Sequence, residues 1–155
     1  MVNSGRKRIR IRVAGILLNR KNELLLVNHR KKGKSYWLLP GGGVEYGETM
    51  EQALKREFKE ELSLRIKKVE NLVFIHDTVY PGKKRHILNI YYRVKVENIR
   101  KLSPNPDRVL KASGFVTIKN FKKFLFYPDI KNDIICQWNK GFTRTAGYIR
   151  IKWKR

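Results

Sequence analysis

The chain has few acidic side chains, a single cysteine and no long apolar run. Its 155 residues include 13 Asp and Glu against 36 Lys and Arg, a net charge of +23 at pH 7. This imbalance favours anionic partners such as nucleotides, nucleic acid or anionic lipid, and charge alone does not choose among them. Because Cys136 has no second thiol to pair with, a reducing cytoplasm is the expected location.

Two further absences concern membranes and domain number. No stretch approaches the roughly 20 apolar residues of a membrane span, and the first residues lack the apolar core of about 7–15 residues that marks a signal peptide. The sequence also contains no internal repeat, low-complexity tract or linker-like segment. We therefore expect one domain over residues 1–155, with no membrane segment.

Alternating or uniformly apolar segments predict a chain rich in strands. The expected strands are Arg8–Leu18, Glu23–Asn28, Tyr36–Leu39, Leu64–Val69, Leu72–Tyr80, Ile87–Val96, Phe115–Ile118 and Tyr148–Lys154. We expect the first two to form a hairpin, and we expect a second hairpin across Pro81-Gly82. His29–Lys34 is interpreted as a basic loop and Asn98–Asp107 as a flexible surface segment.

Two helices are expected. Thr49 followed by Gln52 is a capping-box pattern, which opens a helix that runs to about Leu62. Ser63 then occupies the position where a helix-ending glycine is usual. Pro128–Trp138 has apolar residues at helical spacing, with proline in its first turn.

The first of these helices carries three carboxylates on one face. Glu57, Glu60 and Glu61 are spaced i, i+3 and i+4, and they share an arc of about 100° with apolar residues. Like charges beside a core need a compensating cation, and clustered carboxylates suit Mg²⁺ or Mn²⁺. The alternative is a charged helix that is solvated all round.

The same helix lies within a longer pattern. The pattern consists of Gly42, five residues, Glu48, seven residues and then the run 56–64 (REFKEELSL). It resembles the signature of the Nudix hydrolases, the family of MutT-like proteins. The departures are Phe58 in place of an aliphatic residue and Ser63 in place of glycine. The segment 37–45 (WLLPGGGVE) also resembles the family's entry into this box, and the order of elements matches from about residue 9 to residue 96.

The resemblance implies an α+β fold with a mixed β-sheet sandwiched between α-helices. It also implies divalent-metal-dependent hydrolysis of a nucleoside diphosphate linked to another group, by attack of water on phosphorus. Carried over by position, the metal ligands are the Gly41 carbonyl, Glu57, Glu60 and Glu61, and Arg56 orients a glutamate. Gly42 and Glu48 support the loop.

The general base is left open between several carboxylates. Glu57 and Glu60 are the candidates within the box. Downstream carboxylates are Asp77, Glu97 and Asp107, and none of them lies in a motif that can be aligned.

Substrate contacts are predicted less directly. Arg12 and Arg30 are candidate phosphate contacts, and Trp37 or Tyr80 is a candidate for stacking on a base. The alternatives are that Trp37 belongs to the core and that the arginines lie on a solvated face. Tyr80 stands beside Pro81, so the family's tyrosine and proline substrate markers do not discriminate here.

The resulting hypothesis is hydrolysis of a pyrophosphate bond in a nucleoside triphosphate, ADP-ribose or a dinucleoside polyphosphate. One alternative is an RNA 5′-end pyrophosphohydrolase, and another is a nucleic-acid-binding protein on the same scaffold, since both would use the net charge. The basic, alternating residues 8–13 and 148–154 predict that the last strand docks on the main sheet or on the partner in a homodimer. The alternative for this last segment is a solvated basic tail.

Overall fold

The computed structural model describes residues 8–31, 33–103, 110–144 and 147–150 of the chain. In chain order its elements are β1 (Ile9–Ile16), β2 (Leu24–Lys31), β3 (Lys34–Leu38), β4 (Gly41–Gly43), α1 (Met50–Leu62), β5 (Ile66–Val79), the 3₁₀ turn η1 (Pro81–Lys83), β6 (His86–Val96), the 3₁₀ turn η2 (Ile99–Lys101), β7 (Leu110–Val116), α2 (Ile118–Phe121), α3 (Lys131–Trp138) and β8 (Gly147–Arg150).

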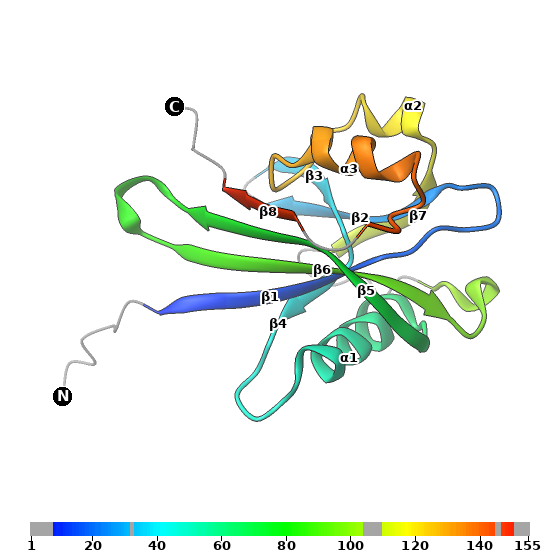
Figure 1. Ribbon diagram of the computed structural model, residues 1–155, viewed down its shortest axis with the longest axis horizontal. Helices are drawn as coiled ribbons and strands as arrows, with labels where there is room; N and C mark the ends of the chain where they lie inside the picture. The colour runs from blue at the N-terminus through cyan, green and yellow to red at the C-terminus, as the bar shows by residue number, and fades with distance from the viewer. Residues whose placement is uncertain (1–7, 32, 104–109, 145–146, 151–155) are drawn as a thin grey trace.

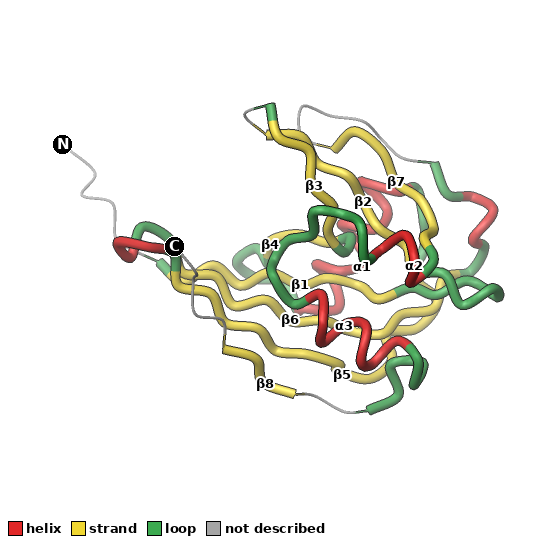
Figure 2. Tube along the Cα trace, turned by 90° about the horizontal axis from the view of Figure 1, so that it is seen from above, coloured by secondary structure: helices red, strands yellow, loops and turns green. Residues whose placement is uncertain are grey.

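The strands form two sheets. The larger has five strands in the order β4-β1-β6-β5-β8, with parallel pairing between β1 and β6 and between β5 and β8, and the smaller has the antiparallel order β3-β2-β7. Figure 1 shows α1 on one side of the large sheet and α2 and α3 on the other. Figure 2 shows β1, β6, β5 and β8 side by side. The predicted α+β class, a mixed sheet between helices, is confirmed.

Each side of the large sheet has its own apolar core, because residues in a strand alternate between faces. On the α1 side, Val13 of β1 and Leu17, which follows the strand, pack with the buried face of α1, while Ala14 and Ile16 belong to the core beneath α3. The strand β2 alternates between the two cores in the same way, so its uniformly apolar sequence reflects burial on both faces.

The prediction that the first two strands form a hairpin is wrong. Both hydrogen-bonding edges of β1 are occupied by β4 and β6, so β2 joins the other sheet. The two segments meet only around their turn, at the bridge Leu18 to Leu24 and through the hydrogen bond from the Leu25 N–H to the Leu17 carbonyl, among the described residues. The outer end of β1 also differs from its alternating pattern. Ile9 and Ile11 are 59% and 38% exposed, since the described helices do not cover this end of the sheet.

Other boundaries shift because strand pairing extends beyond the apolar residues. The expected basic loop after β2 is a hairpin, in which Lys31 pairs with Lys34 across a turn with Gly33 at φ 77°. The two strands expected over residues 64–80 are one continuous strand, β5. The polar residues between them remain in the strand, and its pairing register with β6 shifts at that point. The hairpin of β5 with β6 is confirmed.

Later elements begin or end at different residues from those expected. Helix α3 starts at Lys131, after the cis bond between Tyr127 and Pro128, so proline is not in its first turn. Strand β7 ends at Val116 because Thr117 caps α2. In the expected surface segment, residues 99–101 form η2 and residues 104–109 lie outside the described chain.

The last described strand pairs with the main sheet, as predicted. β8 runs parallel to β5, with Phe74 opposite Gly147 and Asp77 opposite Arg150. Residues 151–154 of the expected strand lie outside the described part of the chain. Among the described residues, no helix is long and apolar enough to cross a membrane.

Candidate active site

The acidic helix α1 begins as its sequence predicts. The Thr49 hydroxyl accepts a hydrogen bond from the Gln52 N–H at 3.2 Å, and the Gln52 side-chain carbonyl accepts one from the Thr49 N–H at 2.7 Å. These two bonds satisfy amide groups that have no partner within the helix. The helix buries Ala53, Leu54, Phe58 and Leu62 against the sheet.

The first departure from the family signature, Phe58, is accommodated by a glycine on the sheet. A Cβ atom on Gly15 of β1 would lie 2.5 Å from Cζ of the Phe58 ring, which is fully buried. The ring therefore fills the space that a side chain at position 15 would need. Helix and sheet stay closely packed although the aromatic side chain is larger than an aliphatic one.

The second departure, Ser63, adopts the conformation that normally selects glycine. Ser63 has φ 57° and ψ 23°, in the left-handed region. Its N–H donates to the Lys59 carbonyl at 3.1 Å, and the Leu64 N–H donates to the Phe58 carbonyl at 3.1 Å. The helix exit of the signature is therefore retained, with the strain of a Cβ atom in this region.

Arg56 ties the helix to the loop before it. Its guanidinium donates to both oxygens of Glu48, at 3.2 and 2.7 Å, to Oε1 of Glu57 at 2.8 Å and to the Gly43 carbonyl at 3.0 Å. The hydrogen bonds from Arg56 lower the pKa of the Glu48 carboxyl, with a contribution from the Glu45 N–H. The same contacts raise the pKa of Arg56. Arg56 therefore links the Glu57 carboxylate to Glu48 and to the backbone of the loop.

Gly42 makes room for a carboxylate. A Cβ atom at this position would lie 2.0 Å from Oε1 of Glu57, so any side chain would displace that group. The glycine is needed for the close approach of the carboxylate to the loop backbone. This contact gives a direct reason for Gly42 in the motif.

The three carboxylates have different environments. Glu57 and Glu61 are mostly buried at the edge of the core, whereas Glu60 is 61% exposed and lies 3.5 Å from the Arg56 guanidinium. In the part of the chain that the structure describes, no group of three or more His, Cys, Asp or Glu side chains converges as a metal site. The donor chemistry nevertheless fits a hard divalent cation, because all three are carboxylates on one helix face beside the loop.

The Gly41 carbonyl, expected as a further ligand, accepts a hydrogen bond from Arg12. The Arg12 guanidinium lies 3.0 Å from this oxygen and 2.9 Å from the Leu39 carbonyl. Gly41 has φ 142°, and a Cβ atom there would lie 2.1 Å from the Val13 carbonyl. Arg12 thus fixes the backbone that enters the box.

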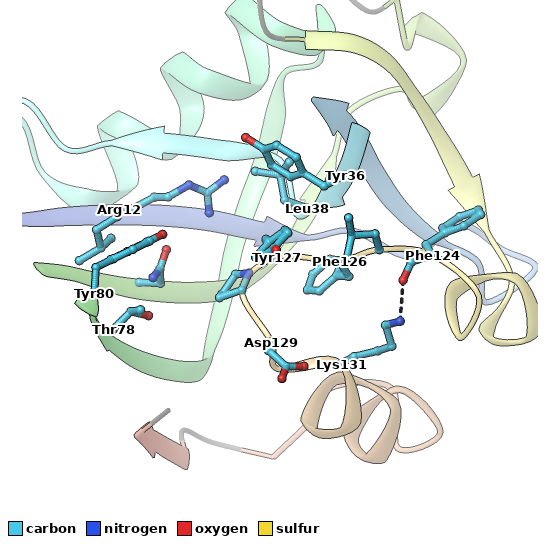
Figure 3. A pocket seen from close by; sticks show the side chains of 14 residues that line it. Arg12, Tyr36, Leu38, Thr78, Tyr80, Phe124, Phe126, Tyr127, Asp129 and Lys131 are labelled. Atoms are coloured by element: carbon cyan, nitrogen blue, oxygen red, sulfur yellow. Dashed lines mark hydrogen bonds between the residues drawn. The ribbon is translucent and has the colours of Figure 1, made fainter. Parts of the chain in front are cut away.

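A cavity of about 450 Å³ is lined by residues of β1, β3, β5 and β6 and of the segment between α2 and α3. Helices α2 and α3 lie on the opposite side of the large sheet from α1. Arg12 is one of its lining residues, so the cavity and the glycine loop meet at this side chain. The walls combine aromatic and polar groups, which Figure 3 shows around the opening. Polar or aromatic lining residues include Tyr36, Tyr80, Asn89, Tyr127 and Asp129.

Two of the four predicted substrate contacts line the cavity, and the other two do not. Arg12 and Tyr80 line the cavity, and Arg85 lies over the Tyr80 ring at 5.2 Å. Trp37 stacks on Phe124 with centroids 5.0 Å apart and packs against the core, so it does not line the cavity. Arg30 is exposed on β2 and is not a lining residue either.

Of the three downstream carboxylates considered as bases, the two that the structure describes, Asp77 and Glu97, are not lining residues of the cavity. Asp77 is 2.7 Å from Nε2 of His86, and Glu97 is exposed after β6. Asp107 lies outside the described residues.

Sequence reasoning missed several lining residues because they come from different parts of the chain. Tyr36 is on β3, Asn89 on β6, and Tyr127 and Asp129 lie between α2 and α3. Burial raises the pKa of the Tyr36 phenol. One signal in the sequence could have indicated a lining residue: Asn89 is a polar residue inside the apolar strand segment ILNIYY. Burying a polar side chain costs free energy unless it is hydrogen-bonded, so such a residue is a candidate for a site.

Comparison with known proteins agrees with this arrangement. The family model for the NUDIX domain matches residues 8–135. An ADP-ribose pyrophosphatase of Methanocaldococcus jannaschii is 32% identical over 127 residues, which cover 81% of this chain and 72% of that protein. An RNA pyrophosphohydrolase of Francisella tularensis subsp. mediasiatica is 38% identical over 68 residues, 44% of this chain and 43% of the relative.

Solved structures share the fold. A NUDIX hydrolase from Nitrosomonas europaea superposes with a TM-score of 0.70 at 20% sequence identity, covering 86% of this chain and 90% of that one. The chain therefore belongs to the Nudix family. It is a pyrophosphohydrolase, an enzyme of a family that generally uses divalent metals.

Proposed function

We propose that the protein hydrolyses the pyrophosphate bond of a small nucleoside diphosphate linked to another group. The observation that carries this proposal is the cavity beside the glycine loop. Its volume of about 450 Å³ is within the range of small-ligand sites, and its aromatic and polar lining suits a nucleoside. Arg12 lines the cavity and donates to the Gly41 carbonyl, and the next residue, Gly42, adjoins the Glu57 carboxylate. The phosphates of a nucleoside bound in the cavity would therefore follow the glycine loop toward the carboxylates of α1.

Each residue of the box has a role in this proposal. Glu57, Glu60 and Glu61, with the Gly41 carbonyl, would hold Mg²⁺ or Mn²⁺, which would supply charge neutralisation for the phosphate oxygens and activation of water. Glu57 or Glu60 accepts the proton of the attacking water. Arg56 holds Glu57 at 2.8 Å, and Glu48 fixes Arg56 in turn.

Among the nucleotides considered, ADP-ribose is the first to test. The relative from Methanocaldococcus jannaschii that bears the name ADP-ribose pyrophosphatase aligns with most of both chains. Nucleoside triphosphates and dinucleoside polyphosphates complete the set. The unpaired, exposed Cys136 fits a cytoplasmic location for an enzyme acting on such metabolites.

The test is a hydrolysis screen with Mg²⁺ or Mn²⁺ across nucleoside triphosphates, ADP-ribose, dinucleoside polyphosphates and 5′-triphosphate RNA, followed with phosphate and mononucleotide detection. We expect the highest kcat/KM with a small dinucleotide-like substrate, and loss of turnover in excess EDTA. Undiminished turnover in EDTA, or no hydrolysis of any small nucleotide, would overturn the proposal.

A second candidate is removal of pyrophosphate from RNA 5′ ends. It is favoured by the net charge of +23 and by the partial similarity to an RNA pyrophosphohydrolase. Preferred turnover of 5′-triphosphate RNA over every small nucleotide would support it. Tight RNA binding without any hydrolysis would instead indicate a binding protein on this scaffold.

A further inference from the structure

His29 of β2 lies between the acidic helix and the cavity. Leu25 and Val27 of the same strand belong to the apolar core that contains the buried face of α1, and alternation along a strand places His29 on that side as well. The pairing register of β2 with β7 shifts between Asn28 and His29. Such irregularities often redirect a side chain beside an active site. Here the ring of His29 reaches the last turn of α1.

The ring of His29 has a carboxylate and an aromatic side chain as neighbours. Its Nε2 lies 4.0 Å from Oε1 of Glu61, and the two side chains are only 15% and 20% exposed. Tyr36, opposite His29 in register on β3, packs edge-on against the ring with centroids 6.0 Å apart. Tyr36 lines the cavity and packs on Tyr127, another lining residue, with centroids 5.4 Å apart (Figure 3). His29 therefore connects the cavity wall to the third carboxylate of α1.

The contact between His29 and Glu61 has one favourable protonation pattern. Glu61 must be ionised to bind a cation, and an ionised carboxylate only accepts hydrogen bonds. The contact is therefore attractive when Nε2 carries a proton, as it does in one neutral tautomer and in the imidazolium. The atoms Nε2 of His29 and Oε2 of Glu61 are both inaccessible to solvent. Because polar interactions are stronger where water is excluded, this contact can influence where the carboxylate lies.

Two residues thus approach the three carboxylates of α1. Arg56 lies 2.8 Å from Oε1 of Glu57 and 3.5 Å from Oε2 of Glu60, and His29 lies beside Glu61. Ligating carboxylates are commonly oriented by such partners, and replacing a partner typically lowers metal affinity about 10- to 100-fold. Arg56 belongs to the box of residues 42–64, whereas His29 lies outside it in the sequence.

We propose that His29 is a positioning residue of the active site, which holds the Glu61 carboxylate in place for the divalent cation through the proton on Nε2. The inference rests on the proposed function for its assignment of Glu61 as a ligand. It adds a residue of β2 to a set of groups that otherwise comes from one loop and one helix.

The test compares two variants that separate the N–H group from the ring. His29→Gln keeps an N–H donor and loses the ring, whereas His29→Phe keeps a ring to pack on Tyr36 and loses the donor. The affinity of the substrate-free protein for Mn²⁺ is measured at one pH by electron paramagnetic resonance of the free ion. We expect His29→Phe to bind Mn²⁺ about tenfold or more weakly, and His29→Gln to stay within about threefold of the wild type.

A control and a double variant separate positioning from support of the fold. His86→Gln is the matched control, because His86 also lies beside a carboxylate, 2.7 Å from Asp77, but outside the box, and it should leave Mn²⁺ affinity unchanged. In a Glu61→Gln background the carboxylate is absent, so His29→Phe should have little further effect on Mn²⁺ affinity. A residue that only supports the fold would weaken binding equally with and without Glu61.

Three results would each overturn the inference: wild-type Mn²⁺ affinity in His29→Phe, equal losses in His29→Phe and His29→Gln, or an equal effect of His29→Phe in both backgrounds. If His29→Phe does not fold, as judged by circular dichroism, His29→Leu takes its place with the same expected loss. A wild-type protein that binds no Mn²⁺ would remove the metal assignment of the proposed function and this inference with it. Wild-type binding that His29→Phe does not weaken would remove this inference alone.

Discussion

The two faces of the large sheet are built in different ways. On one face, α1 and the loop before it bring the carboxylates, Arg56 and Gly42 together from one stretch of about twenty residues. On the other face, the cavity is assembled from β1, β3, β5, β6 and the segment between α2 and α3. In the function proposed above, the first face would carry out the hydrolysis and the second would distinguish substrates.

This difference has a practical consequence. Changes on the α1 face should lower turnover for every substrate, because they affect the groups that act on the pyrophosphate. Changes in the cavity should alter KM and the choice of base with less effect on turnover.

The largest effect is expected on the α1 face itself. Glu60→Gln or Glu61→Gln should reduce kcat by about 10²-fold or more, since each would remove one of the charged ligands proposed for the metal. Steady-state kinetics across a Mg²⁺ titration measures this, with Lys59→Gln on the exposed side of the helix as control. Near-parental activity of either variant at limiting metal would show that the residue is not a ligand.

Gly42→Ala should be almost as damaging. The new Cβ would lie 2.0 Å from Oε1 of Glu57, so the carboxylate must move, and kcat should fall about 10- to 100-fold. Gly114→Ala is the matched control, because that glycine has open space around it and should leave kcat unchanged. A Gly42→Ala enzyme with unaltered kcat would mean that the position of Glu57 is not critical.

Gly15→Ala tests the packing that supports the α1 face. The added methyl group would meet the Phe58 ring at 2.5 Å, so we expect a loss of about 1–3 kcal/mol in the free energy of unfolding. Adding Phe58→Leu should recover part of this loss, because the smaller side chain restores the space. Urea denaturation of the two single variants and the double variant gives the coupling, and strictly additive effects would contradict the contact.

On the cavity side, Tyr80→Ala should raise KM for an adenine nucleotide about tenfold while kcat changes less, because stacking on a base contributes about 1–3 kcal/mol. Trp37→Phe is the comparison, since Trp37 is not itself a lining residue and a phenyl ring keeps its stacking on Phe124, so KM should stay unchanged. If Trp37→Phe raises KM and Tyr80→Ala does not, the assignment of the cavity is wrong.

The smallest effect concerns the helix exit. Ser63 has φ 57°, so Ser63→Gly should stabilise the protein by about 1 kcal/mol through relief of left-handed strain. Thermal unfolding measures the change, with Ser103→Gly as a control for loss of a serine elsewhere. A melting temperature that is unchanged or lower would show that the hydroxyl of Ser63 offsets the strain.

Local patterns predicted local structure well. The capping box, the end of α1 and the β5–β6 hairpin follow from residues that are near one another in the chain, and the structure confirms them. Strand partners were harder to predict, because a strand that is apolar on both faces can pair with several others. The alternation in β1 likewise indicated which residues share a face of the sheet. It did not indicate how much of each face other elements cover, and Ile9 and Ile11 are exposed.

The sequence by itself determined the family and its reaction class, because the box of residues 42–64 places its charged groups through the geometry of one loop and one helix. Only the tertiary structure decided which side chains meet at the cavity. Register across β1, β6 and β5 brings Arg12, Asn89 and His76 into one row although up to 77 positions separate them, and Trp37 turns toward the core instead. Such contacts depend on strand pairing over long sequence separation, which no local pattern encodes.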